Sequence, residues 1–409
     1  MNAAAAAWLV RVLRSQRSWS DPIPAETWPA LLDAARAADV TGLFADRALE
    51  LVPGIPDPVA AQLVTSHQAA ARHAAFLFVE AERICNAFEQ RCLPSVLLKG
   101  VALARTVYTH PAGRSFRDLD ILVDPPEIDR AAQCLAELGY QFVDPPELRA
   151  AHRRYHFHLA MEGSSRIRVE LHWGLVRPDD PYRLWAVDLL SERFFPPGRS
   201  SFPCPHADGQ VLHAVVSLLR CGFTQLKRIA DLDRLVRSGT TLRWPRILRT
   251  AEQRGLARGL RLLVELTAEL FDTPLDEPLR IIPPLGRARH RLDDLGIELF
   301  PLALPPSAWG PARHVVRYWL AEDRLRIVWM FLRRAQLERA RLEALRVPRR
   351  IRAQALAKRT AILAYLFARQ IALGFAPHRR VLECLLTSAP VPTSAPRVAG
   401  RGGTPAPIP

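Results

Sequence analysis

Residues 96–123 read VLLKGVALARTVYTHPAGRSFRDLDILV, and this stretch decides the expected fold. A short apolar run ends at Lys99, a helix-like stretch follows, and an arginine-rich turn leads to Asp118 and Asp120. Side chains of a strand alternate between its two faces, so we expect both aspartates to point the same way. Two carboxylates on one face repel each other and resist burial, which indicates a cation or an arginine partner beside them.

Composition limits the class of protein without choosing its function. The chain has 409 residues, 49% of them hydrophobic and 24% charged, which is typical of a globular protein with more than one domain. The net charge of +15 is carried mostly by arginine and suggests an acidic partner, such as a nucleotide, a nucleic acid or an anionic membrane surface.

The cysteines and the apolar stretches predict where the protein works. The six cysteines form no CxxC pair and have no regular spacing, which indicates a reduced protein and a cytoplasmic location. The apolar stretch AILAYLFARQIALGF is interrupted by Arg369 and is shorter than the ~20 residues of a membrane span, so we expect no transmembrane segment.

Hydrophobic periodicity divides the chain into regions. We expect an N-terminal helical region at 1–93, a core of strands and helices at 94–200, a helical domain at 201–300, basic helices at 301–387 and a disordered tail at 388–409. The predicted fold class is α+β, with a small mixed sheet embedded in a predominantly helical chain.

The mixed core supplies a third acid. The expected elements are strands at 96–98, 118–123, 155–161 and 167–173, with helices at 101–108 and from Asp124 to Leu138. In the last strand Glu170 shares a face with Arg168 and His172, so Glu170 comes from a different strand than the aspartate pair.

This set of residues has the pattern that nucleotidyl transfer requires. The reaction needs divalent metals that neutralise charge at the attacking and leaving oxygens, and carboxylates must surround those metals. A pair of acids two apart on a strand and a third acid from a neighbouring strand can hold them, while a glycine turn before a helix lets backbone amides approach phosphates. Asp118, Asp120, Glu170 and Gly100 fill these positions.

The same segments resemble a known family. LLKG, then VYTHPAGRSFRDLDILV, a helix ending in LGY, and VELHW resemble the uncharacterised nucleotidyltransferase family of the DNA polymerase beta-like superfamily, over roughly residues 25 to 270. In that family a Lys-Gly pair stands where other members have Gly-Ser, and an arginine precedes the DxD motif by four residues. The matching residues here are Lys99, Gly100, Arg114, Asp118, Asp120 and Glu170.

The resemblance implies a polymerase beta-like fold and a metal-dependent enzyme. Asp118, Asp120 and Glu170 would be catalytic and would hold two Mg²⁺ ions, while Lys99, Gly100 and Arg114 would bind the nucleotide. The substrate would be an NTP, with ATP expected. The acceptor is left open among a small molecule, a peptide and a protein, and nucleic acid is not favoured because no RNA-binding module is recognisable.

Other interpretations remain open. The departure from Gly-Ser at Lys99 allows a catalytically inactive fold used for binding or assembly. The basic helices at 313–359 allow a solvated arginine face, binding to nucleic-acid phosphates or binding to an anionic membrane surface. The two aspartates could be a solvated strand end paired with Arg114 and Arg117, and Glu170 a surface acid opposite Arg168. No zinc site is expected at His152, His156 and His158, because no cysteine lies nearby.

Overall fold

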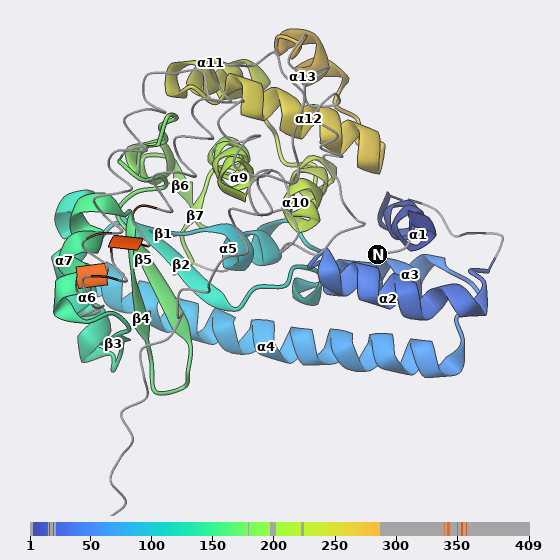
Figure 1. Ribbon diagram of the computed structural model, residues 1–409, viewed down its shortest axis with the longest axis horizontal. Coiled ribbons are helices and arrows are strands. Elements are labelled where there is room, and N and C mark those ends of the chain that lie inside the picture. The colour runs from blue at the N-terminus through green and yellow to red at the C-terminus, as the bar shows by residue number, and fades with distance from the viewer. Residues whose placement is uncertain are drawn as a thin grey trace, which may run out of the picture. The chain divides into compact units, whose positions relative to one another are not determined.

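A computed structural model describes residues 3–14, 16, 19, 22–178, 180–196, 202–221 and 225–286, and isolated residues between 339 and 357 (Figure 1). Residues up to 334 belong to one compact unit, and those from 335 onward belong to a second. The tail expected at 388–409 and nearly all of the basic helices expected at 301–387 lie outside the described residues. Every strand that the structure describes belongs to the first unit.

The described part of this unit contains a mixed sheet of five strands, in the order β1-β2-β5-β4-β3. Strand β2 runs parallel to β5, and the other neighbouring pairs are antiparallel. The strands are β1 (Ser95–Leu97), β2 (Asp118–Val123), β3 (Gln141–Phe142), β4 (His158–Glu162) and β5 (Arg168–His172). This small sheet within a mainly helical chain confirms the α+β class.

The sheet separates two hydrophobic cores. On one face, Leu119, Ile121 and Val169 pack with the buried stripes of α4 (Asp57–Gln90) and α6 (Ile128–Glu137). On the other face, Leu122 joins a larger core shared with the helices that follow the sheet in sequence. Figure 1 shows α4 running along one side of the strands, with α9 and α10 on the opposite side. The alternation in β2 therefore aims its aspartates toward the helices of the second core.

The larger core joins the two ends of the unit. It combines residues of the N-terminal helices, such as Leu13 and Phe44, with residues of the later helices, such as Leu263. The N-terminal helices are α1 (Ala3–Arg14), α2 (Trp28–Ala37) and α3 (Thr41–Leu51), preceding α4. The later ones are α8 (Val187–Leu190), α9 (Ala207–Cys221), α10 (Leu226–Arg237), α11 (Trp244–Arg254), α12 (Ala257–Phe271) and α13 (Asp276–Ile281). The five-part domain division remains a prediction.

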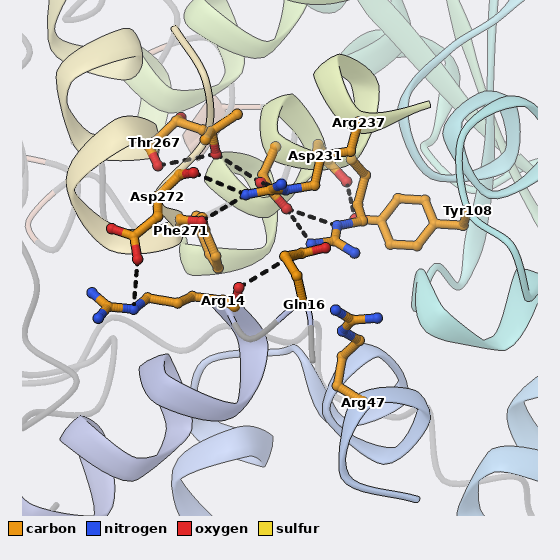
Figure 2. Close-up of polar contacts among 12 residues, drawn as sticks. Arg14, Gln16, Arg47, Tyr108, Asp231, Arg237, Thr267, Phe271 and Asp272 are labelled. Carbon is orange, nitrogen blue, oxygen red and sulfur yellow. Dashed lines mark hydrogen bonds and ion pairs between the residues drawn. The ribbon is translucent and has the colours of Figure 1, made fainter. Parts of the chain in front are cut away.

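Two polar contacts accompany this joining of distant helices. Arg14 at the end of α1 pairs with Asp272 after α12, with 3.0 Å between Nε and Oδ2 (Figure 2). Arg237 at the end of α10 donates to the backbone oxygens of Phe271 at 2.9 Å and Asp272 at 3.1 Å. The carbonyls at the end of α12 thus obtain a side-chain donor, which helix ends need.

The expected elements of the core follow one another in the expected order, and the structure adds β3 and a helix before β4, which were not expected. α5 (Lys99–Thr106) follows β1 directly, and short 3-10 turns η2 (Pro111–Gly113) and η3 (Pro125–Glu127) precede β2 and α6. The strand expected at 155–161 begins only at His158, because α7 (Pro146–Tyr155) occupies the preceding residues. Proline and glutamate in its first turn and basic residues in its last turn favour that helix.

Two short strands, β6 (Arg193–Phe194) and β7 (Cys204–Pro205), form a second small sheet. The backbone N–H of Leu97 in β1 donates to the oxygen of Pro203 at 2.8 Å, just before β7. Among the helices that the structure describes, none combines the length and the apolar character needed to cross a membrane.

Candidate functional site

The parallel pairing of β2 with β5 brings the three acids predicted from the sequence onto neighbouring strands. Asp120 lies directly opposite Glu170 in the register, and Asp118 lies opposite Arg168. Residues paired in this way share a face, and Asp118 shares it too because it is two residues from Asp120. Asp120 is 4% exposed, whereas Asp118 and Glu170 are half-buried. One face of the sheet thus carries three carboxylates near the residue at which β2 begins.

Two imidazoles lie beside these acids, and the sequence pattern does not predict that they belong to the site. His172 lies two residues after Glu170, and His158 of β4 pairs directly opposite His172. His172 Nε2 lies 2.9 Å from Asp120 Oδ1 and 3.6 Å from Glu170 Oε2. His158 Nε2 lies 3.8 Å from the same oxygen of Glu170. Both histidines can be seen in the sequence, but only the register between β4 and β5 shows that they lie next to each other.

Lys99 reaches the same place from the start of α5. Its ammonium forms an ion pair with Asp120 Oδ1, and its side chain is 14% exposed. The backbone of Lys99 has a φ of 51°, in the left-handed region that non-glycine residues rarely adopt. Such a conformation costs roughly 1–3 kcal/mol and persists where the surroundings enforce it, often at functional sites.

Gly100 leaves no room for a side chain. A Cβ at this position would lie 2.4 Å from the Cβ of Phe116 and 3.0 Å from its Cγ. Phe116 itself is buried and belongs to the core under the sheet. The glycine therefore allows the turn of α5 to pack closely against the residues that lead into β2, which fixes Lys99 relative to Asp120.

The acids differ in their electrostatic environment. Burial, together with the charges of Asp120 and Glu170, raises the pKa of Asp118 above its usual value. Burial also opposes ionisation of Asp120, but Lys99 and His172 outweigh it and hold the pKa of Asp120 well below its usual range. The pKa of Glu170 is likewise lowered against its burial, chiefly by His172. Asp118 is thus the carboxylate that lacks sufficient positive charge.

Arg114 is held elsewhere, by a carboxylate of α10. Its Nε and Nη2 donate to the two oxygens of Asp231 at 2.6 and 2.8 Å, and its Nη1 donates to the oxygen of Ser115 at 2.7 Å. The hydroxyl of Tyr108 donates to the same carboxylate at 2.8 Å (Figure 2). Arg114 and Asp231 are 4% and 3% exposed. This bidentate pair fixes α10 against the segment between α5 and β2.

A small cavity lies between α5, α9 and α10, beside Lys99. Its polar lining comes from Lys99, Gln210, His213, Ser217, Arg228 and Asp231. His213 is buried, and this burial, together with the positive charge of Lys99, lowers its pKa well below the usual value. The imidazole is therefore neutral at pH 7, and the positive charge of the wall comes from the lysine and the arginine.

The donor set fits divalent metal ions. Carboxylate oxygens such as those of Asp118, Asp120 and Glu170 are the ligands that hard cations such as Mg²⁺ prefer. Within the described residues, His158, Glu170 and His172 also offer ligand atoms that all lie within 4.8 Å of one another. The shortage of positive charge at Asp118 favours a cation beside this carboxylate.

Comparison with known proteins supports the family expected from the sequence. A family model described as "Uncharacterised nucleotidyltransferase" matches residues 24–272. This range contains the whole sheet, both imidazoles of the site and α9 to α12. No curated protein matches the chain. Since the model covers more than half of the 409 residues, this chain belongs to a family of uncharacterised nucleotidyltransferases.

Proposed function

We propose that the protein is a metal-dependent nucleotidyltransferase that moves a nucleoside monophosphate from an NTP, with ATP expected, to an acceptor. Asp118, Asp120 and Glu170 would hold two divalent ions, expected to be Mg²⁺. The observation that supports this most strongly is the parallel register, in which Asp120 faces Glu170 and Asp118 shares their side of the sheet. When bound, the ions would neutralise charge on the attacking and leaving oxygens at the α-phosphate.

The other residues bind and orient the nucleotide. Lys99 brings a positive charge next to Asp120 and borders the cavity. If a metal ion were bound by Asp120 instead, the ammonium of Lys99 could pair with a phosphate oxygen. Gly100 holds Lys99 in place through its close approach to Phe116. Because Arg114 donates to Asp231, we assign it an indirect part in nucleotide binding, as the residue that holds the wall of the cavity.

The class of acceptor is proposed from the charges at the site. Lys99 and Arg228 bring two positive charges together, which suits the phosphates of the nucleotide better than a negatively charged acceptor. The acceptor then approaches from the half-exposed side of Asp118. A hydroxyl of a small molecule, a peptide or a protein side chain satisfies this arrangement.

The test is transfer of label from the α-phosphate. Purified protein is given each α-labelled NTP with Mg²⁺ in a cell extract, and labelled products are separated. We expect a labelled acceptor that depends on the metal and is lost in the Asp118→Asn variant. Equal labelling by that variant, or labelling from γ-labelled nucleotide alone, would contradict nucleotidyl transfer.

The alternative is a catalytically inactive fold that serves as a binding or assembly module. The ion pair between Lys99 and Asp120 favours it, because the ammonium competes with a metal for the same oxygen. Calorimetric titration distinguishes the two proposals. Metal-dependent binding of an NTP supports the enzyme, whereas no binding of any of the four NTPs supports the module.

A further inference from the structure

The imidazoles beside Glu170 form a second set of ligand atoms, which adjoins Asp120 through His172. Nitrogen Nε2 of His172 and nitrogen Nε2 of His158 lie 3.6 and 3.8 Å from Glu170 Oε2. They come from neighbouring antiparallel strands in direct register, so a rigid sheet fixes their separation. Metal sites need this kind of support, because ligands on strands are held more precisely than ligands on loops.

The orientation of His172 is that of a metal ligand. Its Nδ1 lies 3.3 Å from the backbone oxygen of Gly174, and in the tautomer that carries the hydrogen on Nδ1 this nitrogen can donate to that carbonyl. Its Nε2 faces carboxylate oxygens of Asp120 and Glu170. With the hydrogen on Nδ1, the lone pair of Nε2 would face these carboxylates, and a bound metal ion would then take the place that a proton on Nε2 otherwise fills. A hydrogen bond from Nδ1–H to a backbone carbonyl is the usual way in which proteins orient such a ligand.

His158 presents one ring nitrogen to Glu170. Its Nε2 lies 3.8 Å from Glu170 Oε2. Its Nδ1 is buried and has no hydrogen-bond partner within the described part of the chain. Nε2 is therefore the nitrogen of His158 that faces the other two ligands.

The spacing and the donor types indicate the class of metal. Zn²⁺ binds imidazole nitrogen and carboxylate oxygen at about 2.0–2.1 Å in a tetrahedral arrangement, whose edges are then roughly 3.3 Å long. The two measured separations from Glu170 Oε2 exceed this length by only a few tenths of an ångström. Imidazole ligands suit late first-row ions, whereas Mg²⁺ prefers oxygen and keeps several waters.

We propose that His158, Glu170 and His172 form a binding site for a divalent transition-metal ion of the zinc class. The inference rests on the proposed function only in that Glu170 is shared with the ligands of the proposed reaction, and it changes the expectation of two Mg²⁺ ions to a centre of mixed composition. It differs from the expectation of no zinc because the site uses histidines from two strands and needs no cysteine.

The test measures metal binding directly, without nucleotide. The full chain is stripped with a chelator and titrated with Zn²⁺ against a chromophoric competitor. We expect one tightly bound ion per chain. In His158→Gln and in His172→Gln we expect a loss of affinity at least as large as the ~10–100-fold that loss of an outer-shell partner costs. The matched control is His156→Gln, whose ring is 4.4 Å from that of His158 but outside the ligand set, and which should keep the affinity within about threefold of wild type.

A spectroscopic measurement covers the case in which His172→Gln does not fold. Wild-type protein loaded with Co²⁺ should show the intense visible bands of a tetrahedral site, and these bands should disappear when an equimolar amount of Zn²⁺ is added. An octahedral spectrum, or Zn²⁺ affinity unchanged in a folded His158→Gln variant, would overturn the proposal.

The outcome is separable from that of the proposed function. Asp118→Asn lies outside the ligand set and should retain Zn²⁺ binding while abolishing label transfer. Tight Zn²⁺ binding without label transfer from any NTP would refute the enzyme and leave the metal site intact. Label transfer with a Zn²⁺ affinity that does not depend on His158 would refute the metal site and leave the enzyme intact.

Discussion

Two ionic clusters border the cavity between α5, α9 and α10, and they are built in opposite ways. Around Asp231, every strong charge is matched, since Arg114 donates to both carboxylate oxygens and Tyr108 adds a third donor. On the sheet, Asp118 and Asp120 share one face and Glu170 lies opposite Asp120. Lys99 pairs with Asp120, and Arg168 Nη2 lies 4.0 Å from Glu170 Oε1, so two cations accompany three acids. The first cluster is closed, and the second is half-open with an excess of negative charge.

This difference separates a structural ion pair from a binding site. A buried pair with complete hydrogen bonding holds its elements together, and removing one partner leaves an uncompensated charge. In the second cluster, burial and the neighbouring acids raise the pKa of Asp118, which means that its ionised form is unfavourable. A bound cation would stabilise the ionised form. Burial alone does not make this distinction, because Asp120 and Asp231 are buried to a similar extent.

The largest expected effect is on catalysis. Asp118→Asn keeps the shape of the side chain and removes one charge, so we expect label transfer to fall by about 10³-fold, as when a group that stabilises the transition state is lost. The initial rate with saturating nucleotide and Mg²⁺ measures it. The control is Asp124→Asn, an exposed acid just after the same strand, which should retain the wild-type rate. A fall shared by both variants would remove the distinction.

The next effect is on stability. Arg114→Met leaves Asp231 buried without its partner, and we expect the free energy of unfolding to fall by about 3–5 kcal/mol. Chemical denaturation measures it. The double variant Arg114→Met with Asp231→Leu removes both charges and should recover much of that loss. If the double variant is as unstable as the sum of the single changes, the two residues do not act as a pair.

A smaller effect concerns the turn at the start of α5. Gly100→Ala brings a Cβ within 2.4 Å of Phe116, so we expect a loss of about 1–3 kcal/mol in the free energy of unfolding and weaker nucleotide binding. Gly209→Ala in α9 is the matched control, since its Cβ would meet neighbours only at 3.4 Å or more. Alanine is the better helix former there, so that variant should be neutral or slightly stabilised. Equal losses in the two variants would show that the contact with Phe116 is not the cause.

The smallest effect is a pH dependence of opposite sign at two neighbouring acids. The pKa of Asp118 is raised above 3.8 in the folded protein, so its contribution to stability is fully present below pH 3.8 and is lost as the pH rises through the raised pKa. Asp118→Asn should therefore be slightly more stable than wild type at pH 7. The lowered pKa of Asp120 gives stability that is present above pH 3.8 and is lost as the pH falls through that pKa. Asp120→Asn should therefore be less stable at pH 7.

Denaturant midpoints between pH 4 and 7 measure both differences. The gain in Asp118→Asn should shrink as the pH falls, and the loss in Asp120→Asn should persist until the pH is well below 3.8. Differences of the same sign in the two variants would contradict the electrostatic account.

The strands of the site could be predicted because they depend on local pattern. The strand at 118–123 has the bounds expected from alternation, and the strand bearing Glu170 differs by one residue at each end. Alternation also predicts that Asp118 and Asp120 share a face, since this property depends on spacing alone. Whether Glu170 lies on the same face as the two aspartates depends on how β5 pairs with β2. The structure shows a parallel register that sets Glu170 opposite Asp120.

The partners across long distances could not be predicted. Asp231 is 117 residues from Arg114, and no local pattern connects them. The resemblance to the family therefore led us to expect the arginine at the nucleotide. His158 and His172 come together only because the antiparallel register of β4 and β5 sets them opposite each other. A shift of one residue would move His158 to the other face of the sheet.

The most direct test of the contrast is calorimetric titration of a nonhydrolysable ATP analogue, with Mg²⁺, into wild type, Asp118→Asn and Arg114→Met with Asp231→Leu. We expect metal-dependent binding to wild type, no detectable binding to Asp118→Asn, and binding to the double variant weakened by no more than about tenfold, which is about 1.4 kcal/mol. Wild-type affinity in Asp118→Asn, or complete loss in a folded double variant, would contradict the contrast between an open site and a closed ion pair.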